Sequence, residues 1–482
     1  MNAHTVFAVI FALLDLACII AVIFFERKNP ASTIAWVLVL IFLPLVGFLA
    51  YAMFGSGFHV NKRKRYAIKQ LSDSLNKRTM GKYLENQDEC AQCDESGLAR
   101  MISYLNSEGG HRFTLDNEAE IFTSGGECFD RMLADMRAAK SSIHLLYYIF
   151  RDDSLGREVA ATLARKAGEG VAVRVIYDSL GSMLGKERVF KALKKAGGQV
   201  AAFSPLFSHI SSHLRLNYRN HRKITVIDGL AGYVGGMNVG VEYLGRHKRL
   251  RPWRDTSLRI TGDAVGFLQE RFLLDWASVS EDDMAKTDMH ALFPPPPRSG
   301  RRLGMQIVSS GPDSSTGAIK NGLLEMLYSA RKYLYIQTPY FTPDDSFIDA
   351  LRIAAASGVD VRLMIPGLKE NPLVSAATYS YAQQLLQAGV RVFRYRGFLH
   401  AKTMVSDGIA ATVGTANIGT RSFALNFEIN AFIYGRDFAA RCEKVFLYDQ
   451  TQCEELSEEW FKALRPAVRI AFGISRLFAP LI

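Results

Sequence analysis

The chain has 482 residues, of which 49% are hydrophobic and 22% charged, and it carries a formal net charge of +11. The apolar fraction excludes a disordered chain, and six cysteines in this length exclude a disulfide-stabilised scaffold. At roughly 150 residues per domain, the length allows about three domains. The positive charge indicates a polyanionic partner such as nucleic acid, anionic lipid or phosphate, so its position in the chain matters.

The excess charge lies in two short segments that flank the main body of the chain. Residues 56–82 carry eight Lys and Arg and one Asp, a net +7, and residues 461–482 carry a net +4. The residues between them, 83–460, sum to zero. A nucleic-acid-binding protein more often spreads its basic residues over the binding domain, so this distribution predicts an anionic membrane surface as partner and no nucleic acid.

Two apolar stretches at the start predict a transmembrane hairpin over residues 1–58. Residues 6–25 contain one charge, Asp15, and residues 31–54 contain none, and each stretch reaches the roughly 20 residues that span a bilayer. A signal peptide is the weaker alternative, because no cleavage site follows and a second apolar stretch comes at once. Since the basic segment 59–109 follows the hairpin, the positive-inside rule places it and the whole C-terminal body in the cytoplasm.

From residue 110 onward the sequence alternates strand-like and helix-like segments and repeats itself once. This indicates an α/β fold with two similar halves, which we place at 110–285 and 303–450, joined by a Pro- and Arg-rich linker at 286–302. The clearest repeated feature is a His, a Lys two residues later and an Asp five residues after the Lys. The two copies are His221, Lys223 and Asp228, and His400, Lys402 and Asp407.

The repeated motif predicts phosphoryl chemistry at one shared site. Residues two apart on a strand share a face, so each His and its Lys point the same way. Small residues and an Asn follow each copy, ending at Asn238 and Asn417. Two Lys and two Asn would hold the oxygens of a phosphate, while one His attacks phosphorus and the other serves as acid and base. Such a mechanism needs no metal or other cofactor.

A catalytic His usually has a carboxylate on its second ring nitrogen, which fixes its tautomer. Each half offers one in front of a strand-like run: Asp255 stands 34 residues after His221, and Glu428 stands 28 residues after His400. Glu242 is a rival in the first half. We therefore expect the carboxylates that orient the two His to come from this set.

The paired motifs resemble the phospholipase D superfamily and, within it, bacterial cardiolipin synthases. Further similar stretches are Asn217–His221, Trp253–Thr256, Thr338–Pro343 and Phe398–Lys402. The resemblance implies two pseudo-symmetric phospholipase D-like halves, each a β-sheet flanked by helices, sharing one active site. It also implies a bacterial inner-membrane enzyme that transfers a phosphatidyl group from one phosphatidylglycerol to another through a phosphatidyl-histidine, giving cardiolipin and glycerol.

The matching positions imply which residues act. His221, Lys223, Asn238, His400, Lys402 and Asn417 match the family's site, and Asp228 and Asp407 match its motif. We favour His221 as the nucleophile and His400 as the acid and base. The first copy departs from the family in carrying Gly236 where Ser is usual.

The C-terminal segment 451–482 predicts a membrane contact. Lys462, Arg465, Arg469 and Arg476 fall on one stripe of a helix, and apolar residues that include Phe472 and Leu477 accompany them. Three alternatives to a synthase remain: a membrane phospholipase D-type hydrolase or transphosphatidylase with water or another alcohol as acceptor, a nuclease, and a non-catalytic scaffold. The neutral body argues against the nuclease and the intact motifs against the scaffold. The oligomeric state, including a homo-oligomer, stays open.

Overall fold

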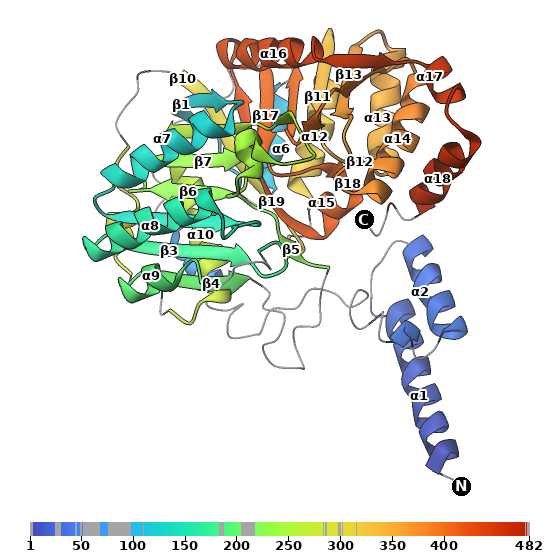
Figure 1. Ribbon diagram of the computed structural model, residues 1–482, viewed down its shortest axis with the longest axis horizontal. Coiled ribbons are helices and arrows are strands. Elements are labelled where there is room, and N and C mark those ends of the chain that lie inside the picture. The colour runs from blue at the N-terminus through green and yellow to red at the C-terminus, as the bar shows by residue number, and fades with distance from the viewer. Residues whose placement is uncertain are drawn as a thin grey trace.

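The computed structural model describes most of the chain. The described residues are 3–24, 30–43, 46–48, 51, 68–75, 98–108, 110–182, 188–203, 217–282, 284, 287–296, 300, 302–314, 316–477 and 479. Figure 1 shows a large α/β body from which the N-terminal helices α1 and α2 project.

The first half alternates strands and helices from residue 114 to residue 279. Its elements are β1 (Thr114–Phe122), α7 (Gly125–Ala138), β2 (Ser142–Tyr147), α8 (Ser154–Gly168), β3 (Ala172–Asp178), α9 (Lys191–Lys195), β4 (Gln199–Phe203), β5 (Arg219–Asn220), β6 (Ile224–Ile227), β7 (Ala231–Gly235), η3 (Glu242–Arg246), β8 (Trp253–Arg254), β9 (Ser257–Gly262) and α10 (Ala264–Val279). The short helix α11 (Met289–Leu292) lies in the linker that follows.

The second half repeats this order. Its elements are β10 (Arg302–Ser310), α12 (Ala318–Ser329), β11 (Tyr333–Gln337), β12 (Phe341–Thr342), α13 (Asp345–Ala356), β13 (Asp360–Pro366), α14 (Pro372–Leu386), β14 (Arg391–Tyr395), β15 (Phe398–Leu399), β16 (Thr403–Ser406), β17 (Ala410–Gly414), β18 (Ile418–Gly419), α15 (Thr420–Ala424), β19 (Asn426–Tyr434) and α16 (Arg436–Gln450). The chain ends with β20 (Cys453–Leu456), α17 (Glu458–Lys462) and α18 (Pro466–Leu477).

One 16-stranded sheet runs through both halves. Its order is β20-β14-β13-β11-β16-β17-β19-β10-β1-β9-β7-β6-β2-β3-β4, with β5 paired to β19 beside this path. Strands β1 and β10 meet antiparallel at the centre, and the order on one side of them mirrors the order on the other. The predicted α/β fold with two similar halves is confirmed.

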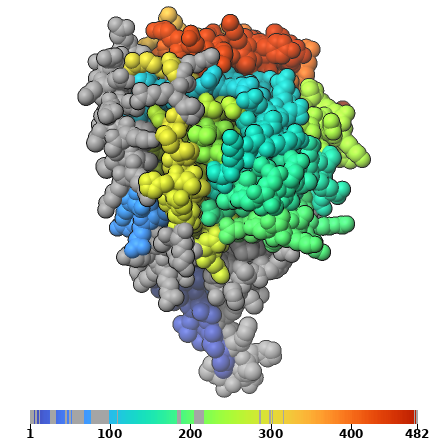
Figure 2. Space-filling model, turned by 90° about the vertical axis from the view of Figure 1, so that its left-hand side faces the viewer, coloured from blue at the N-terminus to red at the C-terminus, as the bar shows by residue number. Residues whose placement is uncertain are grey.

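Helices cover both faces of this sheet because its strands are apolar on both sides. In β2, Leu145 packs with helices α7 and α8, whereas its neighbour Leu146 packs with α10 on the opposite face. The helix at 68–75 adds Leu71 and Leu75 to the α10 side, and Figure 2 shows it in blue against the yellow α10 region.

Two very short parallel pairs cross between the halves. Strand β5, just before His221, pairs with the start of β19, and β15, just before His400, pairs with β8. The chain therefore places each His in register with a segment of the opposite half. This crossing decides the geometry of the site described below.

The N-terminal stretches predicted to span a membrane contain helices α1 (Ala3–Phe24) and α2 (Pro30–Phe42). They pack together through Val22, Leu40 and Tyr51. Of the helices formed by the described residues, none combines the length and the hydropathy needed to cross a membrane.

Helix α18 packs on α14 and leaves an apolar stripe exposed. Phe472, which we expected to contribute outward-facing apolar surface, is buried instead, with its ring 5.7 Å from that of Tyr379. The exposed apolar positions are Ile470, Ile474 and Leu477, at 61%, 51% and 74% exposure.

Candidate active site

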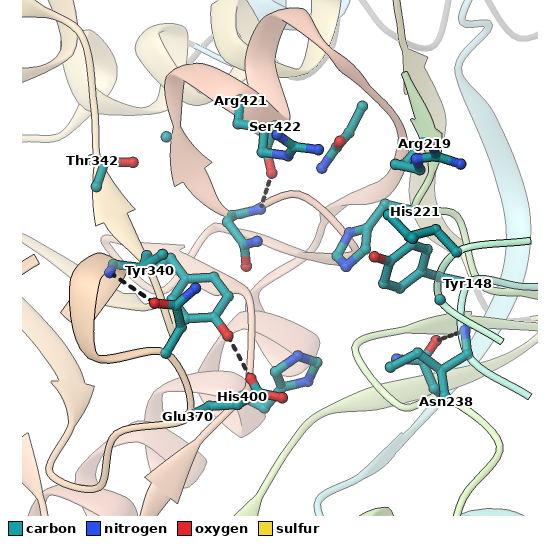
Figure 3. Close-up of a pocket in the computed structure, with 18 of the residues that line it drawn as sticks. Tyr148, Arg219, His221, Asn238, Tyr340, Thr342, Glu370, His400, Arg421 and Ser422 are labelled. Atoms are coloured by element: carbon teal, nitrogen blue, oxygen red, sulfur yellow. Dashed lines mark hydrogen bonds between the residues drawn. The ribbon is translucent and has the colours of Figure 1, made fainter. Parts of the chain in front are cut away.

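A cavity of about 780 Å³ opens between the two halves, and both contribute side chains to it. His221 and Asn238 line it from the first half, and His400 and Asn417 line it from the second. Figure 3 shows His221 and His400 on different sides of this cavity. The repeat thus brings two equivalent imidazoles to one space.

His221 is held by Glu428, which belongs to the opposite half. The Nδ1 atom of His221 lies 3.0 and 2.9 Å from the two carboxylate oxygens of Glu428. The backbone prepares this contact: β5 and β19 pair in register, and the His221 N–H donates to the carbonyl of Phe427 at 2.9 Å. The residue that follows Phe427 is Glu428, so the carboxylate stands beside the ring.

His400 has the symmetric arrangement with Asp255. Its Nδ1 lies 2.6 Å from Asp255 Oδ2, and its N–H donates to the carbonyl of Arg254 at 2.6 Å. Each carboxylate therefore holds the His of the other half, a pairing that the sequence left open. The physical reason is the crossing of β5 and β15, which sequence distance along one half does not reveal.

The two carboxylates are supported in different ways. Thr415 and Ser422 donate hydroxyl hydrogen bonds to Glu428 at 2.6 and 2.9 Å. Burial alone would raise the pKa of Glu428, but His221, Lys223 and the Thr415 hydrogen bond bring that pKa below its ordinary value. Asp255 accepts the backbone N–H of Thr256 at 2.7 Å. Both carboxylates are almost completely buried.

The two motif lysines are buried beside the backbone of their own histidines, and neither is among the residues that line the cavity. Lys223 Nζ donates to the carbonyl of His221 at 2.7 Å, and Lys402 Nζ donates to the carbonyl of His400 at 2.5 Å. Burial lowers the pKa of Lys223 to about 7 and that of Lys402 to about 8. Ammonium groups in such a dry environment interact strongly with a phosphate anion.

His221 is neutral near pH 7 in the absence of substrate. Burial lowers the pKa of His221 to about 4, although Glu428 opposes this shift. Burial and the Lys402 charge also lower the pKa of His400, while Asp255 and Glu370 act in the opposite direction. A neutral imidazole whose Nδ1–H is bound by a carboxylate presents a free Nε2 lone pair, as a nucleophile requires.

The two asparagines line the cavity but are held differently. Asn238 accepts from the N–H of Ile149 at 3.1 Å and donates to the Tyr243 hydroxyl at 2.6 Å. The Oδ1 atom of Asn417 is buried and has no hydrogen-bond partner among the described residues. Asn417 therefore keeps hydrogen-bonding capacity for a group that enters the cavity.

The motif aspartates do not reach the cavity. Asp228 accepts the N–H groups of Lys140, Ser141 and Ser142 at 2.7–2.9 Å, and it lies in a turn with a φ of 53°. Asp407 repeats the arrangement at the start of β11 with a φ of 52°. Both carboxylates tie a turn to the beginning of a neighbouring strand, and neither lines the cavity.

Glu242, the rival orienting carboxylate, bonds Arg151, whereas Nδ1 of each His is held by Glu428 or Asp255. The Oε1 atom of Glu242 forms an ion pair with Arg151 at 3.2 Å. The described residues contain no group of three or more His, Cys, Asp and Glu side chains arranged to hold a metal ion.

Three charged residues of the cavity had no counterpart at the same spacing in the other half, and the sequence repeat therefore did not point to them. Arg219 and Arg421 lie on the His221 side and Glu370 lies on the His400 side (Figure 3). Arg219 forms an ion pair with Asp178 at 3.7 Å, and Arg421 donates to the carbonyl of Asn217 at 3.4 Å. Arg219 and Arg421 thus place positive charge on the His221 side and Glu370 places negative charge on the His400 side, while Arg151, which pairs with Glu242, is a further charged residue of the cavity.

Comparisons with known proteins identify relatives along the whole chain. The sequence matches the family described as "Cardiolipin synthase, PLD-like domain" over residues 132–248 and 323–450, and the family described as "Phospholipase_D-nuclease N-terminal" over residues 13–56. The cardiolipin synthase of Oceanobacillus iheyensis is 44% identical over 475 residues, which cover 97% of each chain. The major cardiolipin synthase ClsA of Bacillus subtilis is 42% identical over 490 residues, which cover 100% of each.

A solved structure shares the fold. The crystal structure of phosphatidylserine synthase from Haemophilus influenzae has a TM-score of 0.60 and 15% sequence identity, and the match covers 80% of this chain and 98% of that one.

Proposed function

The chain belongs to the cardiolipin synthase family of the phospholipase D superfamily, and from this premise we propose that it joins two phosphatidylglycerol molecules into cardiolipin and glycerol in the cavity between His221 and His400. The observation that carries this proposal is the pair of imidazoles that face one cavity, each with its Nδ1 on a buried carboxylate. Such a pair suits a two-step transfer through a covalent intermediate.

The first step forms the intermediate. The Nε2 lone pair of His221 attacks phosphorus of the donor lipid, and the P–O bond to the headgroup glycerol breaks on the opposite side. His400 enters this step as the imidazolium, a form that Asp255 and Glu370 favour, and gives its Nε2 proton to the departing glycerol oxygen. The side-chain N–H of Asn417 donates to a phosphate oxygen, and the positive charges of Lys223 and Lys402 stabilise the negative charge that increases there in the transition state. Glu428 stabilises the positive charge that develops on the His221 ring.

The second step transfers the phosphatidyl group from His221 to the second lipid. A glycerol hydroxyl of a second phosphatidylglycerol enters where the first glycerol left and passes its proton to His400. Its oxygen then attacks phosphorus, and the P–N bond to His221 breaks. The two steps together convert two phosphatidylglycerol molecules into one cardiolipin and one glycerol, and each group of the enzyme returns to its starting state.

The reaction is tested with purified full-length protein in phosphatidylglycerol vesicles without added metal. We expect cardiolipin and free glycerol in equal amounts. Phosphatidic acid as the sole product would show that water is the acceptor and would contradict the proposal. The variants His221→Ala and His400→Ala should each stop turnover, since one site needs both rings; near-normal activity of either would contradict the shared site.

We also propose that the protein is held at a bacterial inner membrane from both ends. The apolar stretches 6–25 and 31–54 would span the bilayer as a hairpin, and the basic segment after them would lie on anionic lipid at the cytoplasmic face. At the other end, Ile470, Ile474 and Leu477 form an exposed apolar stripe on α18, with Arg469 and Arg476 exposed on the same helix.

Helix α18 stands close to elements that line the cavity, which supports its role in lipid contact. It packs on α14, whose first residues line the cavity. The carbonyl of Ala479, just after α18, accepts a hydrogen bond from Thr420 at 3.2 Å, and Arg421 of the cavity follows directly. A membrane touching α18 would therefore present lipid headgroups near the active site. Protease treatment of intact cells tests the orientation, and cleavage of the body from outside would contradict it.

A further inference from the structure

We propose that Glu370, held by Tyr340, forms a subsite for the glycerol headgroup on the His400 side of the cavity and selects a polyol as the alcohol in both steps. This inference rests on the proposed phosphatidyl transfer and adds to it the residue that recognises the leaving and entering group. Glu370 lines the cavity on the loop between β13 and α14, and Figure 3 shows it directly beside His400.

A carboxylate at this place requires an explanation, because every substrate of the reaction is an anion. The negative charge of Glu370 repels phosphate, and it offsets part of the attraction that the lysines provide. Its charge also acts on His400 and Lys402, since both pKa values are raised by it. Because Glu370 opposes phosphate binding, we explain its presence in the cavity by a neutral part of the substrate to which it binds.

The adjacent helix does not use this carboxylate as its cap. Glu370 precedes helix α14, whose N-terminus attracts negative charge, but the cap of that helix is Asn371. The Asn371 side chain accepts the N–H groups of Leu373 and Val374 at 3.0 and 3.3 Å. The helix end is therefore already satisfied, and Glu370 itself is exposed toward the cavity mouth.

Tyr340 fixes the position of the carboxylate and leaves acceptor capacity. Its hydroxyl donates to Glu370 Oε2 at 2.5 Å. Burial and the Glu370 charge raise the pKa of Tyr340, so the phenol stays protonated and remains the donor. An ionised carboxylate has about four acceptor positions, of which Tyr340 uses one. The others suit hydroxyl donors, which a glycerol headgroup supplies.

The two sides of the cavity bind different parts of the substrate. Arg219 and Arg421, on the His221 side, favour the phosphate, whereas Glu370, on the His400 side, favours hydroxyl groups. In an in-line transfer the leaving and entering alcohols occupy the side opposite the nucleophile. A polyol subsite beside His400 therefore agrees with His400 as acid and base and with His221 as the nucleophile.

The test compares two acceptors that share a three-carbon chain, labelled glycerol and 1-propanol, at equal concentration with phosphatidylglycerol as donor. Each transfer forms a P–O bond to the acceptor, breaks the P–N bond to His221 and passes the acceptor's proton to His400. The products, labelled phosphatidylglycerol and phosphatidylpropanol, are separated and counted. We expect the wild type to favour glycerol and Glu370→Gln to reduce that preference about tenfold, because a charge-assisted hydrogen bond to the polyol is lost.

The acceptor ratio separates recognition from an electrostatic effect on His400, which would slow both acceptors equally. An unchanged ratio in Glu370→Gln, with or without a lower rate, would overturn the subsite. Tyr340→Phe is the second variant and should reduce the preference by a smaller factor, since the carboxylate stays but is less fixed. Glu158→Gln, on an exposed helix outside the cavity, is the matched control and should keep the wild-type ratio. Phosphatidic acid as the only wild-type product would instead contradict the proposed transfer itself.

Discussion

Gly236 and Asp255 lie so close that no side chain fits between them: a Cβ atom at residue 236 would stand 2.0 Å from Asp255 Oδ1 and 2.8 Å from its Cγ. The equivalent residue of the second half is Thr415, whose hydroxyl donates to Glu428 at 2.6 Å. The two halves thus support their carboxylates by different means. In the first half the carboxylate takes the space that a side chain occupies in the second.

Gly236→Ala should therefore impair catalysis by His400 indirectly, through Asp255. The added methyl group would push Asp255 away from Nδ1 of His400, and the ring would lose its orientation. We expect kcat for cardiolipin formation to fall about 10- to 100-fold, the usual effect of losing a partner that orients a catalytic His. Gly126→Ala is the control, because its Cβ would meet nothing closer than 3.6 Å. Wild-type kcat in Gly236→Ala would show that the Asp255 contact is dispensable.

The covalent intermediate should be found on His221. Protein mixed with phosphatidylglycerol that carries a radioactive phosphate, and quenched within one turnover, should yield a labelled peptide that contains residue 221. The physical reason is that His221 is neutral near pH 7 and sits opposite the acidic side where the alcohol is expected to bind. Phosphohistidine is labile in acid, so the peptides are mapped at alkaline pH. Label at His400 would assign the two roles the other way round.

The activity should fall on the alkaline side at a lower pH than ordinary lysines would permit. Burial lowers the pKa of Lys223 to about 7 and that of Lys402 to about 8. The cationic form that holds phosphate exists below these values and is lost as the pH rises through them. We expect kcat/KM, which reports the free enzyme, to decline on the alkaline side. Loss of the His400 proton, whose pKa burial lowers, contributes to this decline, and the lysines contribute between about pH 7 and pH 8. On the acid side it should hold until the pH approaches about 4, where His221 becomes protonated.

Arg substitutions of the lysines check this assignment. The guanidinium group keeps its charge throughout the working range, so Lys402→Arg should lose the decline that Lys402 contributes even if its kcat is lower. An unchanged alkaline limb in both Lys223→Arg and Lys402→Arg would show that another group controls it.

The two-half fold was predictable because the same pattern of residues occurs twice in the sequence. Two copies of the His, Lys and Asp spacing indicated two halves and one shared cavity, and the mirrored strand order around β1 and β10 agrees with that. The partners of His221 and His400 were not predictable from spacing. These partners depend on β5 and β15. Each is a strand of two residues that pairs with a strand of the opposite half, and each is too short to show a periodic pattern.

The charged residues that break the symmetry were missed for a related reason. The equivalent of Arg421, four residues after the Asn of its half, is Glu242 in the first half, and the equivalent of Arg219, two residues before the His, is Phe398 in the second. A sequence repeat shows only the residues that the two halves share. The difference between the two sides of the cavity lies in what they do not share, which only the three-dimensional arrangement displays.

The motif aspartates should prove structural, and the two halves provide matched tests. Asp228→Asn and Asp407→Asn keep a residue type that tolerates a positive φ but remove the charge that accepts three backbone N–H groups. Each should lower the free energy of unfolding by about 1–2 kcal/mol while kcat stays near that of the wild type. Loss of turnover by orders of magnitude in a protein that still unfolds cooperatively would instead make these residues part of the chemistry.

The effect of Asp228→Asn on stability should depend on pH in a defined direction. Burial alone would raise the pKa of Asp228, but the N–H groups of Ser142, Ser141 and Lys140 bring it below the ordinary value. A carboxylate with a depressed pKa stabilises the folded state above the ordinary pKa of Asp and loses this contribution as the pH falls through its folded-state pKa. Denaturant unfolding of the wild type and the variant should therefore differ at pH 7 and converge in acid. A difference that persists at low pH would point to a steric effect of the amide.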